Sequence, residues 1–427
     1  MRLELGTFPV ADIVFTDQTK WNDGVLEIDL EELQSLVRGD PRIARAELEL
    51  ARPGESVRIW PVRDVVEPRV KVDGPGVAYP GICGRPIDMV GEGRTHRLSG
   101  IGVVEVSAVD WHDAGGDPLN LFLDMSGPWA QALPHHSRLL NLCLVVEPQP
   151  ELSTHAKNQA VHAAVLSISD RLAATTVGLI PPTTDVFELK EVDPSLPRVV
   201  FIWGLHSPEG KSGSIHTFCT SIYGSTRLTP PWIMHPNEIL DGAVTGPYRT
   251  AFATSWCNAN NPVMLELYRR HGVDLAFAGC IMYRTEWTEQ HQKDLTALQA
   301  AKMARFLNAK GAVVTWDAGG NEFMEAIRTA RACERTGIKT VFITSEGEAS
   351  GGAPTILEPL AEVDAIVSTG FVNLNHLEPL PAAKRVIGLP EIYLRHWGGA
   401  KAPTATNTEA CPYVDHYGFN ALRCVAY

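Results

Sequence analysis

Residues 199–203 read VVFIW, and this run of β-branched and aromatic residues opens the region that decides the fold. The run predicts a buried β-strand. Similar runs follow it at intervals that are long enough to contain a helix. The later predicted strands are Leu275–Met282, Ala312–Trp316, Thr340–Thr344, Ala365–Ser368 and Arg385–Ile387.

Helical patterns fill the intervals between these strands. The alternation of strand and helix predicts a mostly parallel sheet with helices on both faces. We therefore expect a doubly wound α/β domain in this part of the chain. The predicted helices are Pro262–His271, Thr288–Leu307, Glu322–Thr336 and Thr355–Ala361.

The first part of the chain has a different pattern, in which short strands are separated by turns. Leu30–Arg38 and Thr154–Ala173 have helical spacing, whereas Leu139–Val146 is an apolar run typical of a strand buried on both faces. Pro181 and Pro182 then predict a break. We expect an α+β domain over residues 1–195.

The second domain is expected to span residues 196–427 and to carry a polar segment at 235–261, which reads HPNEILDGAVTGPYRTAFATSWCNANN. Many of its side chains can take part in chemistry. Ligands of open α/β sheets bind at the carboxyl ends of the strands. We therefore expect a ligand cleft between the two domains, lined by this segment and by the loops that follow the strands.

Composition excludes several classes of protein. The 427 residues carry a formal charge of −13, which disfavours a nucleic-acid partner. The N-terminus lacks the pattern of a secretory signal, and no apolar run approaches the roughly 18 residues of a membrane span. The eight cysteines form no CxxC pair, so we expect reduced cysteines in a cytoplasmic protein. The size of the chain suggests a homo-oligomer.

Glycine-rich polar loops follow three of the predicted strands, at 316–321, 344–352 and 368–373. Asn321 opens a predicted helix, and the N-terminus of a helix can hold an anion. The same residue types also suit ordinary tight turns. Asn321 is therefore a candidate for substrate binding.

Two glycine-rich turns in the first domain are further candidates. GEGRTH at 91–96 contains Arg94 and His96, and DMSGP at 124–128 contains Ser126. Backbone N–H groups in such turns can bind an anion, and the planar guanidinium of Arg94 suits a bidentate contact with a carboxylate. Ordinary turns are the alternative interpretation.

Nucleotide-binding motifs are excluded. GLHSPEGKS at 204–212 has five residues between its glycines, whereas a phosphate-binding loop of the Walker type has four. The chain also contains no GxGxxG motif.

Longer blocks spread over the chain resemble those of a known family. In order and over nearly its whole length, the chain is similar to the component B proprotein of the glycine, sarcosine and betaine reductases. The blocks are MRLELG (1–6), ELARPGESVRIWPVRDVVEPRVKV (49–72), GEGRTH (91–96), DMSGP (124–128), CLVVEP (143–148), HPNEILDGA (235–243), NNPVMLELYRRHG (260–272) and VDAIVSTG (363–370).

The resemblance implies a function in reductive chemistry. Component B selects a small amino acid or N-methylated amino acid, and its precursor cleaves itself at a cysteine that becomes a pyruvoyl group. A separate selenoprotein then takes the carboxymethyl unit as the C–N bond is cleaved. The resemblance therefore implies a small amino-acid-derived substrate and partner proteins of a reductase-like complex.

This sequence departs from the family at the cleavage site. In processed members, the cysteine follows an asparagine a few residues beyond the DGA turn. Here residues 244–256 read VTGPYRTAFATSW, with no cysteine and no Asn-Cys pair. Cleavage at Cys257, Ser255 or a threonine is the alternative. We predict an uncleaved chain without a pyruvoyl group.

Other chemistry can be assigned to the same segment. Cys257, Glu238, His216 and Asp241 are the candidate catalytic residues, with Cys257 as a nucleophile and His216 or His235 as its base. A zinc or iron site is a second hypothesis, in which Glu238 acts as base on a metal-bound water. A binding protein without catalysis is a third. The candidate metal ligands are His206, His216, His235, Cys219 and Cys257.

Overall fold

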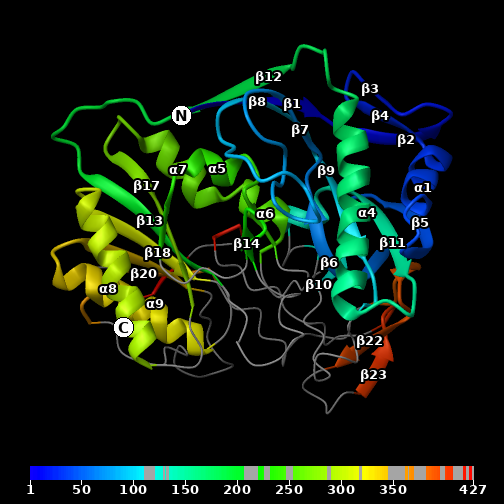
Figure 1. The fold of residues 1–427 in the computed structure, drawn as a ribbon. Coiled ribbons are helices and arrows are strands. Elements are labelled where there is room, and N and C mark those ends of the chain that lie inside the picture. The colour runs from blue at the N-terminus through cyan, green and yellow to red at the C-terminus, as the bar shows by residue number, and fades with distance from the viewer. Residues whose placement is uncertain are drawn as a thin grey trace.

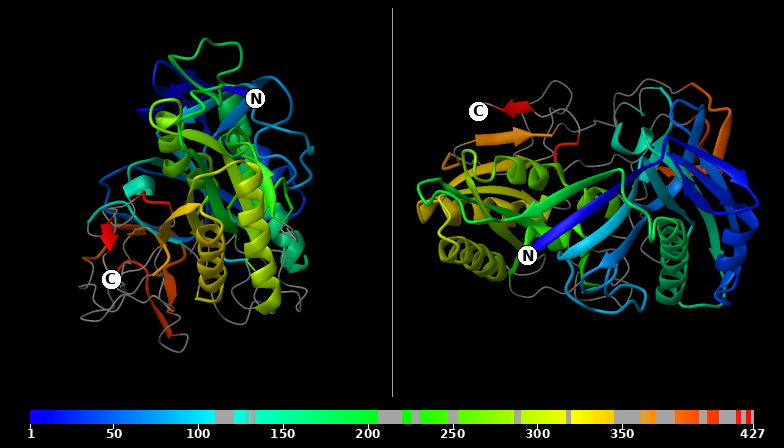
Figure 2. Two further views of the ribbon diagram at one scale, coloured as in Figure 1. Left: turned by 90° about the vertical axis from the view of Figure 1, so that its left-hand side faces the viewer. Right: turned by 90° about the horizontal axis from the view of Figure 1, so that it is seen from above.

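Two large sheets organise the molecule (Figure 1). One apolar core contains buried residues from both of them. Figure 2 shows the same arrangement from two further sides. This computed structural model describes residues 1–109, 121–127, 130, 134–205, 220–225, 231–246, 253–285, 290–316, 320–344, 361–363, 365–369, 381–394, 400–406, 417–419 and 423–425.

The C-terminal sheet has seven strands in the order β15-β17-β13-β18-β19-β20-β24. The five inner strands are parallel, and the two edge strands are antiparallel to their neighbours. The strands are β13 (Arg198–Leu205), β15 (Trp232–Met234), β17 (Ala276–Arg284), β18 (Gly311–Trp316), β19 (Lys339–Thr344), β20 (Ala365–Ser368) and β24 (Arg423–Val425).

Both faces of this sheet are covered, as a parallel sheet requires. Side chains of β13 alternate: Val200 and Ile202 face the helices α8 (Gln290–Phe306) and α9 (Gly320–Arg335). Phe201 and Trp203 point to the other face, where the core also contains Met264 of α7 (Pro262–Arg270). The predicted α/β class is confirmed. The helix predicted at 355–361 lies almost entirely outside the described residues.

The N-terminal part contains a six-stranded mixed sheet in which β10-β6-β9-β11-β5 are neighbours and β21 also pairs with β6. One face packs on α4 (Thr154–Ala174), and the other face contributes to the apolar core shared with the C-terminal sheet. The strands are β5 (Ile43–Ala51), β6 (Val57–Val66), β9 (Ile101–Val106), β10 (Leu121–Asp124), β11 (Leu140–Pro148) and β21 (Arg385–Gly388).

Strand β21 differs from its prediction in one respect. A strand at Arg385–Ile387 is correct, but it joins the N-terminal sheet rather than the C-terminal one, parallel to residues 57–60 of β6. The guanidinium of Arg385 adds side-chain contacts to this pairing, because it forms ion pairs with Glu49 at 3.0 Å and Glu55 at 3.3 Å. A domain boundary between residues 195 and 196 stays a prediction.

Smaller sheets complete the fold. A four-stranded sheet has the order β12-β1-β8-β7, and a three-stranded sheet β2-β4-β3 leads into α1 (Leu30–Arg38). No helix among the described residues is long and apolar enough to cross a membrane. The strands of these two sheets are β1 (Arg2–Pro9), β2 (Asp12–Thr16), β3 (Lys20–Asn22), β4 (Val25–Asp29), β7 (Arg69–Asp73), β8 (Gly93–Ser99) and β12 (Thr183–Glu188), and β22 (Glu391–Leu394) pairs with β23 (Ala400–Pro403).

A buried ionic network ties the N-terminal sheet to α4. Arg63 of β6 donates from Nε to Glu105 of β9 at 2.9 Å, and its side chain is 1% exposed while that of Glu105 is 0% exposed. The other carboxylate oxygen of Glu105 lies 2.7 Å from Nδ1 of His162 on α4. Each charge in this dry environment therefore depends on its partner.

Replacing Arg63 by Met is expected to lower the free energy of unfolding by about 3–5 kcal/mol, because the charge of Glu105 loses its buried cation. Urea denaturation followed by circular dichroism measures the change. Arg45→Met is the matched control: it removes an exposed pair with Glu47 and should leave stability nearly unchanged. An equal loss of unfolding free energy in the two variants would contradict the expected difference between the buried and the exposed ion pair.

Candidate functional site

The described parts of the 235–261 segment, residues 235–246 and 253–261, each contain one short helix, and each helix begins at a capping residue. His235 caps α5 (Pro236–Leu240), and Thr254 caps α6 (Ser255–Ala259). Asn261 caps the next helix, α7, by accepting hydrogen bonds from the amides of Val263 and Met264. The pairs His-Pro, Thr-Ser and Asn-Pro in the sequence are thus helix starts.

Glu238 and His235 form a capping box. Oε1 of Glu238 accepts from the amide of His235 at 2.8 Å, and Oε2 accepts from the hydroxyl of Tyr223 at 2.7 Å. Burial raises the pKa of Glu238, and burial lowers the pKa of His235 to about 4. Both side chains have structural contacts here, so a catalytic or metal-binding role for either stays a prediction.

Asp241 is held tightly by the N-terminal part of the chain. Its carboxylate accepts from the amide of Gly91 at 2.7 Å and from the hydroxyl of Thr95 at 2.5 Å, and it forms an ion pair with Lys71. The side chains of Lys71 and Asp241 are 5% and 2% exposed. These contacts give Asp241 a structural role, and its predicted catalytic role remains untested.

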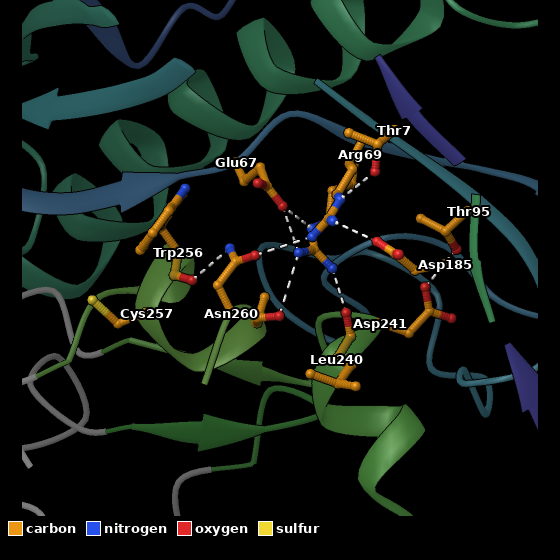
Figure 3. Close-up of polar contacts among 12 residues, drawn as sticks. Thr7, Glu67, Arg69, Thr95, Asp185, Leu240, Asp241, Trp256, Cys257 and Asn260 are labelled. Atoms are coloured by element: carbon orange, nitrogen blue, oxygen red, sulfur yellow. Dashed lines mark hydrogen bonds and ion pairs between the residues drawn. The ribbon is translucent and has the colours of Figure 1, made fainter. Parts of the chain in front are cut away.

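Two arginines of the four-stranded sheet hold the ends of α5 and α6, and Figure 3 shows Arg69 beside Glu67 and Leu240. Arg69 is fully buried and donates to the carbonyl oxygens of Leu240 and Ala259, the last residues of the two helices. Glu67 neutralises its charge at 2.5 Å. Arg97 donates to the side chain of Asn260 at 3.2 Å. A cation at a helix C-terminus also interacts favourably with the helix dipole.

The start of α6 is held from the opposite direction by Asp64 of β6. This buried carboxylate accepts from the amide of Ser255 at 2.8 Å and from its hydroxyl at 2.6 Å. Burial raises the pKa of Asp64 to about 6. The hydroxyl of Ser255 also accepts from the amide of Gly246 at 3.0 Å, so it fixes the turn that leads into α6.

Cys257 lies beside two histidines. Its Sγ atom is 3.7 Å from Nε2 of His136, and the Thr254 hydroxyl donates to the same sulfur at 3.3 Å. One ligand atom from each of His135, His136 and Cys257 lies within 4.8 Å of the other two. The histidines belong to α3 (Pro134–Ser137), in the connection between β10 and β11. In Figure 3, Cys257 points away from Arg69.

Aromatic rings enclose this cluster. The ring of His135 stacks on Phe419 with centroids 4.8 Å apart, and Trp256 lies 5.8 Å from the ring of His136. Burial lowers the pKa of His135 to about 3 and places that of His136 well below its ordinary value. Both imidazoles are therefore neutral at physiological pH. A neutral imidazole can accept a proton from a thiol or bind a metal ion.

The predicted substrate-binding residues of the first domain occupy different surroundings. Arg94 is 45% exposed and already forms a two-donor contact with Glu4. His96 is buried against Thr176, with Nδ1 3.1 Å from its carbonyl oxygen, and burial lowers the pKa of His96. Alternation along β8 turns Thr95, which lies between them, toward Asp241. Binding of a substrate by Arg94 or His96 stays a prediction.

The other predicted residues are less well defined. Ser126 lies in a turn, where its amide donates to Asp124 at 3.3 Å. His206, His216 and Cys219 lie outside the described residues. The backbone of Asn321 belongs to the first turn of α9, but its side chain is outside the described part.

Sequence reasoning missed His135, His136, Asp64 and Arg69. A signal was present for each of them. Adjacent histidines in PHHS are unusual, and charged residues within the apolar run of β6 and at the start of β7 must find partners when the strands are buried. What the sequence does not indicate is that these residues meet the 235–261 segment.

The fold and this cluster define an α/β protein with a buried cysteine–histidine site between two sheets. Residues 1–411 match the family described as glycine/sarcosine/betaine reductase component B subunits. The chain belongs to this family. No solved structure matches it.

Curated relatives cover nearly the whole chain. The sarcosine reductase complex component B subunit alpha of Peptoclostridium acidaminophilum is 35% identical over 412 residues, which are 94% of this chain and 92% of the relative. Its betaine reductase counterpart is 35% identical over 410 residues, 92% and 89% of the two chains. The glycine reductase complex component B subunits alpha and beta of Acetoanaerobium sticklandii are 33% identical over 399 residues, 91% and 89%.

Replacing Asp241 by Asn is expected to destabilise the protein by about 3 kcal/mol or more, because Lys71 is left as an uncompensated buried charge. Urea denaturation measures the loss. The double variant Lys71→Met with Asp241→Asn should recover part of it, since neither charge of this pair remains. If the double variant lost as much unfolding free energy as the two single variants together, the result would contradict an interaction between Lys71 and Asp241.

Asp64 should give the protein a pH dependence of known sign. Its pKa in the folded protein is raised from 3.8 to about 6, so its contribution to stability is fully present below pH 3.8 and is lost as pH rises through about 6. The slope for one such group is about 1.4 kcal/mol per pH unit. Between pH 4 and 7, the free energy of unfolding measured by urea denaturation should fall less for Asp64→Asn than for the wild type.

Proposed function

We propose that this chain is the intact, substrate-activating component of a system that reductively cleaves the C–N bond of a small amino-acid-derived compound. The observation that carries the proposal is the family match over residues 1–411. The relatives are named for reductases of glycine, sarcosine and betaine, which share a nitrogen joined through one carbon to a carboxylate. We expect the substrate to contain the same unit.

The reductive step requires a partner. Cleavage of such a C–N bond to an amine and a methyl carbon consumes two electrons and two protons. The relatives are named as subunits of complexes, and this supports a partner protein that supplies the electrons. We assign to this chain the binding and orientation of the substrate, within an assembly that also includes further copies of the chain.

The proposed chemistry does not use a pyruvoyl group. Residues 244–256 contain no cysteine, and no Asn-Cys pair follows the DGA turn. The first residues of this interval form β16 (Val244–Thr245), paired with β14 (Ser221–Ile222), and the hydroxyls of Ser221 and Thr245 lie 2.5 Å apart. The missing Asn-Cys pair supports an uncleaved chain, and cleavage at Cys257, Ser255 or a threonine is the alternative.

A second candidate function is cysteine-dependent hydrolase or lyase chemistry on the same scaffold. The contact of 3.7 Å between Cys257 Sγ and His136 Nε2 favours it, because a neutral histidine beside a thiol can act as its base. His136 then takes the role that the sequence suggested for His216 or His235. Retained activity of Cys257→Ala would argue against this candidate.

The purified chain is expected to give a single species of 46.6 kDa on intact-mass analysis, with no carbonyl that reacts with a hydrazine reagent. Two fragments, one of which carries the reactive carbonyl, would contradict the uncleaved form. Calorimetric titration with glycine, sarcosine and betaine then tests the substrate class. Binding of none of them would argue against the proposed substrate unit.

A further inference from the structure

We propose that His135, His136 and Cys257 bind a divalent transition-metal ion of the zinc type. The inference rests on the contacts of these residues and does not depend on the proposed reductase function. It also differs from the ligand set expected from the sequence, which combined Cys257 with histidines elsewhere in the chain.

Distance is the first support. The ligand atoms of the three residues all lie within 4.8 Å of one another. In a tetrahedral site with Zn–S of about 2.3 Å and Zn–N of about 2.0–2.1 Å, a sulfur and a nitrogen ligand are separated by about 3.6 Å. The separation of Cys257 Sγ and His136 Nε2 is 3.7 Å, so these two atoms need little movement to share an ion.

The chemistry of the three side chains is the second support. A thiolate with two imidazoles suits zinc and other ions of similar softness, whereas magnesium and calcium prefer oxygen ligands. An imidazole binds a metal through the lone pair of a ring nitrogen, and each of the two histidines offers one such nitrogen to the cluster. The hydroxyl of Thr254 donates to the sulfur at 3.3 Å and can stabilise it as a thiolate ligand.

The surroundings are the third support. His136 and Cys257 are both 0% exposed, and the ring of Phe419 stacks on His135. Three protein ligands leave the fourth tetrahedral position open, as in catalytic rather than structural zinc sites. A water molecule would complete the tetrahedron.

The site also connects distant parts of the fold. α3 leads into β11 of the N-terminal sheet, while α6 lies in the segment held by Arg69 and Asp64. A bound ion would therefore join the N-terminal sheet to the 235–261 segment. It would add a short cross-link beside the apolar core to which both sheets contribute.

Cobalt substitution of the full-length protein tests the site. After treatment with a chelator, the wild type should take up about one Co²⁺ per chain and show the ultraviolet sulfur-to-cobalt band and the visible bands of a tetrahedral thiolate site. Cys257→Ser keeps the shape of the side chain and should lose the sulfur band. Cys280→Ser, at another fully buried cysteine, is the matched control and should keep it.

Affinity measurements give a second readout. His136→Ala should weaken Zn²⁺ binding by more than the 10–100-fold typical of losing a residue that only supports a ligand. Circular dichroism confirms that each variant is folded. The proposal is overturned if the wild type shows no sulfur-to-cobalt band, or if the band persists in Cys257→Ser. Titration of the same samples with glycine, sarcosine and betaine tests the proposed function independently, so that a failure of metal binding and a failure of substrate binding can be told apart.

Discussion

The guanidinium of Arg69 is the interaction on which the geometry of the site depends. It forms an ion pair with Glu67 and donates to the last carbonyl oxygens of α5 and α6. Helices of five residues are not stable by themselves, because the cost of nucleation exceeds the gain from so few hydrogen bonds. Both helices therefore owe their positions to a residue that lies far from them in the sequence. Cys257 is placed by the same contact, since it lies on α6.

The remaining anchors follow the same principle. Asp241 at the end of α5 is held by Lys71 and Thr95, and Ser255 at the start of α6 is held by Asp64. Each contact joins a polar group of the 235–261 segment to a strand of the N-terminal part. Buried polar groups of this kind cost free energy unless they are paired, so they define one arrangement of the two parts. The apolar core alone would not distinguish between neighbouring arrangements.

Much of the fold was predictable from local patterns, because strand and helix periodicities and helix caps depend on nearby residues. The inner strands from β13 to β20 and the start of α7 at Asn261 are examples. The site was less predictable. Cys257 was identified, but His136 lies 121 residues away, and no local pattern indicates that the two meet. The pairing of β21 with β6 is likewise long-range, and no local pattern indicates it.

The pairing of β21 with β6 has a consequence for synthesis of the chain. The amide of Lys384 binds Ser56, which lies 328 residues earlier. At about 5–20 residues per second, the ribosome needs about 16–65 s to make the residues between them. During that time, residues 57–60 of β6 lack the neighbour that β21 later provides. An open sheet edge can pair with other chains, so the nascent protein passes through a period in which it is exposed to aggregation.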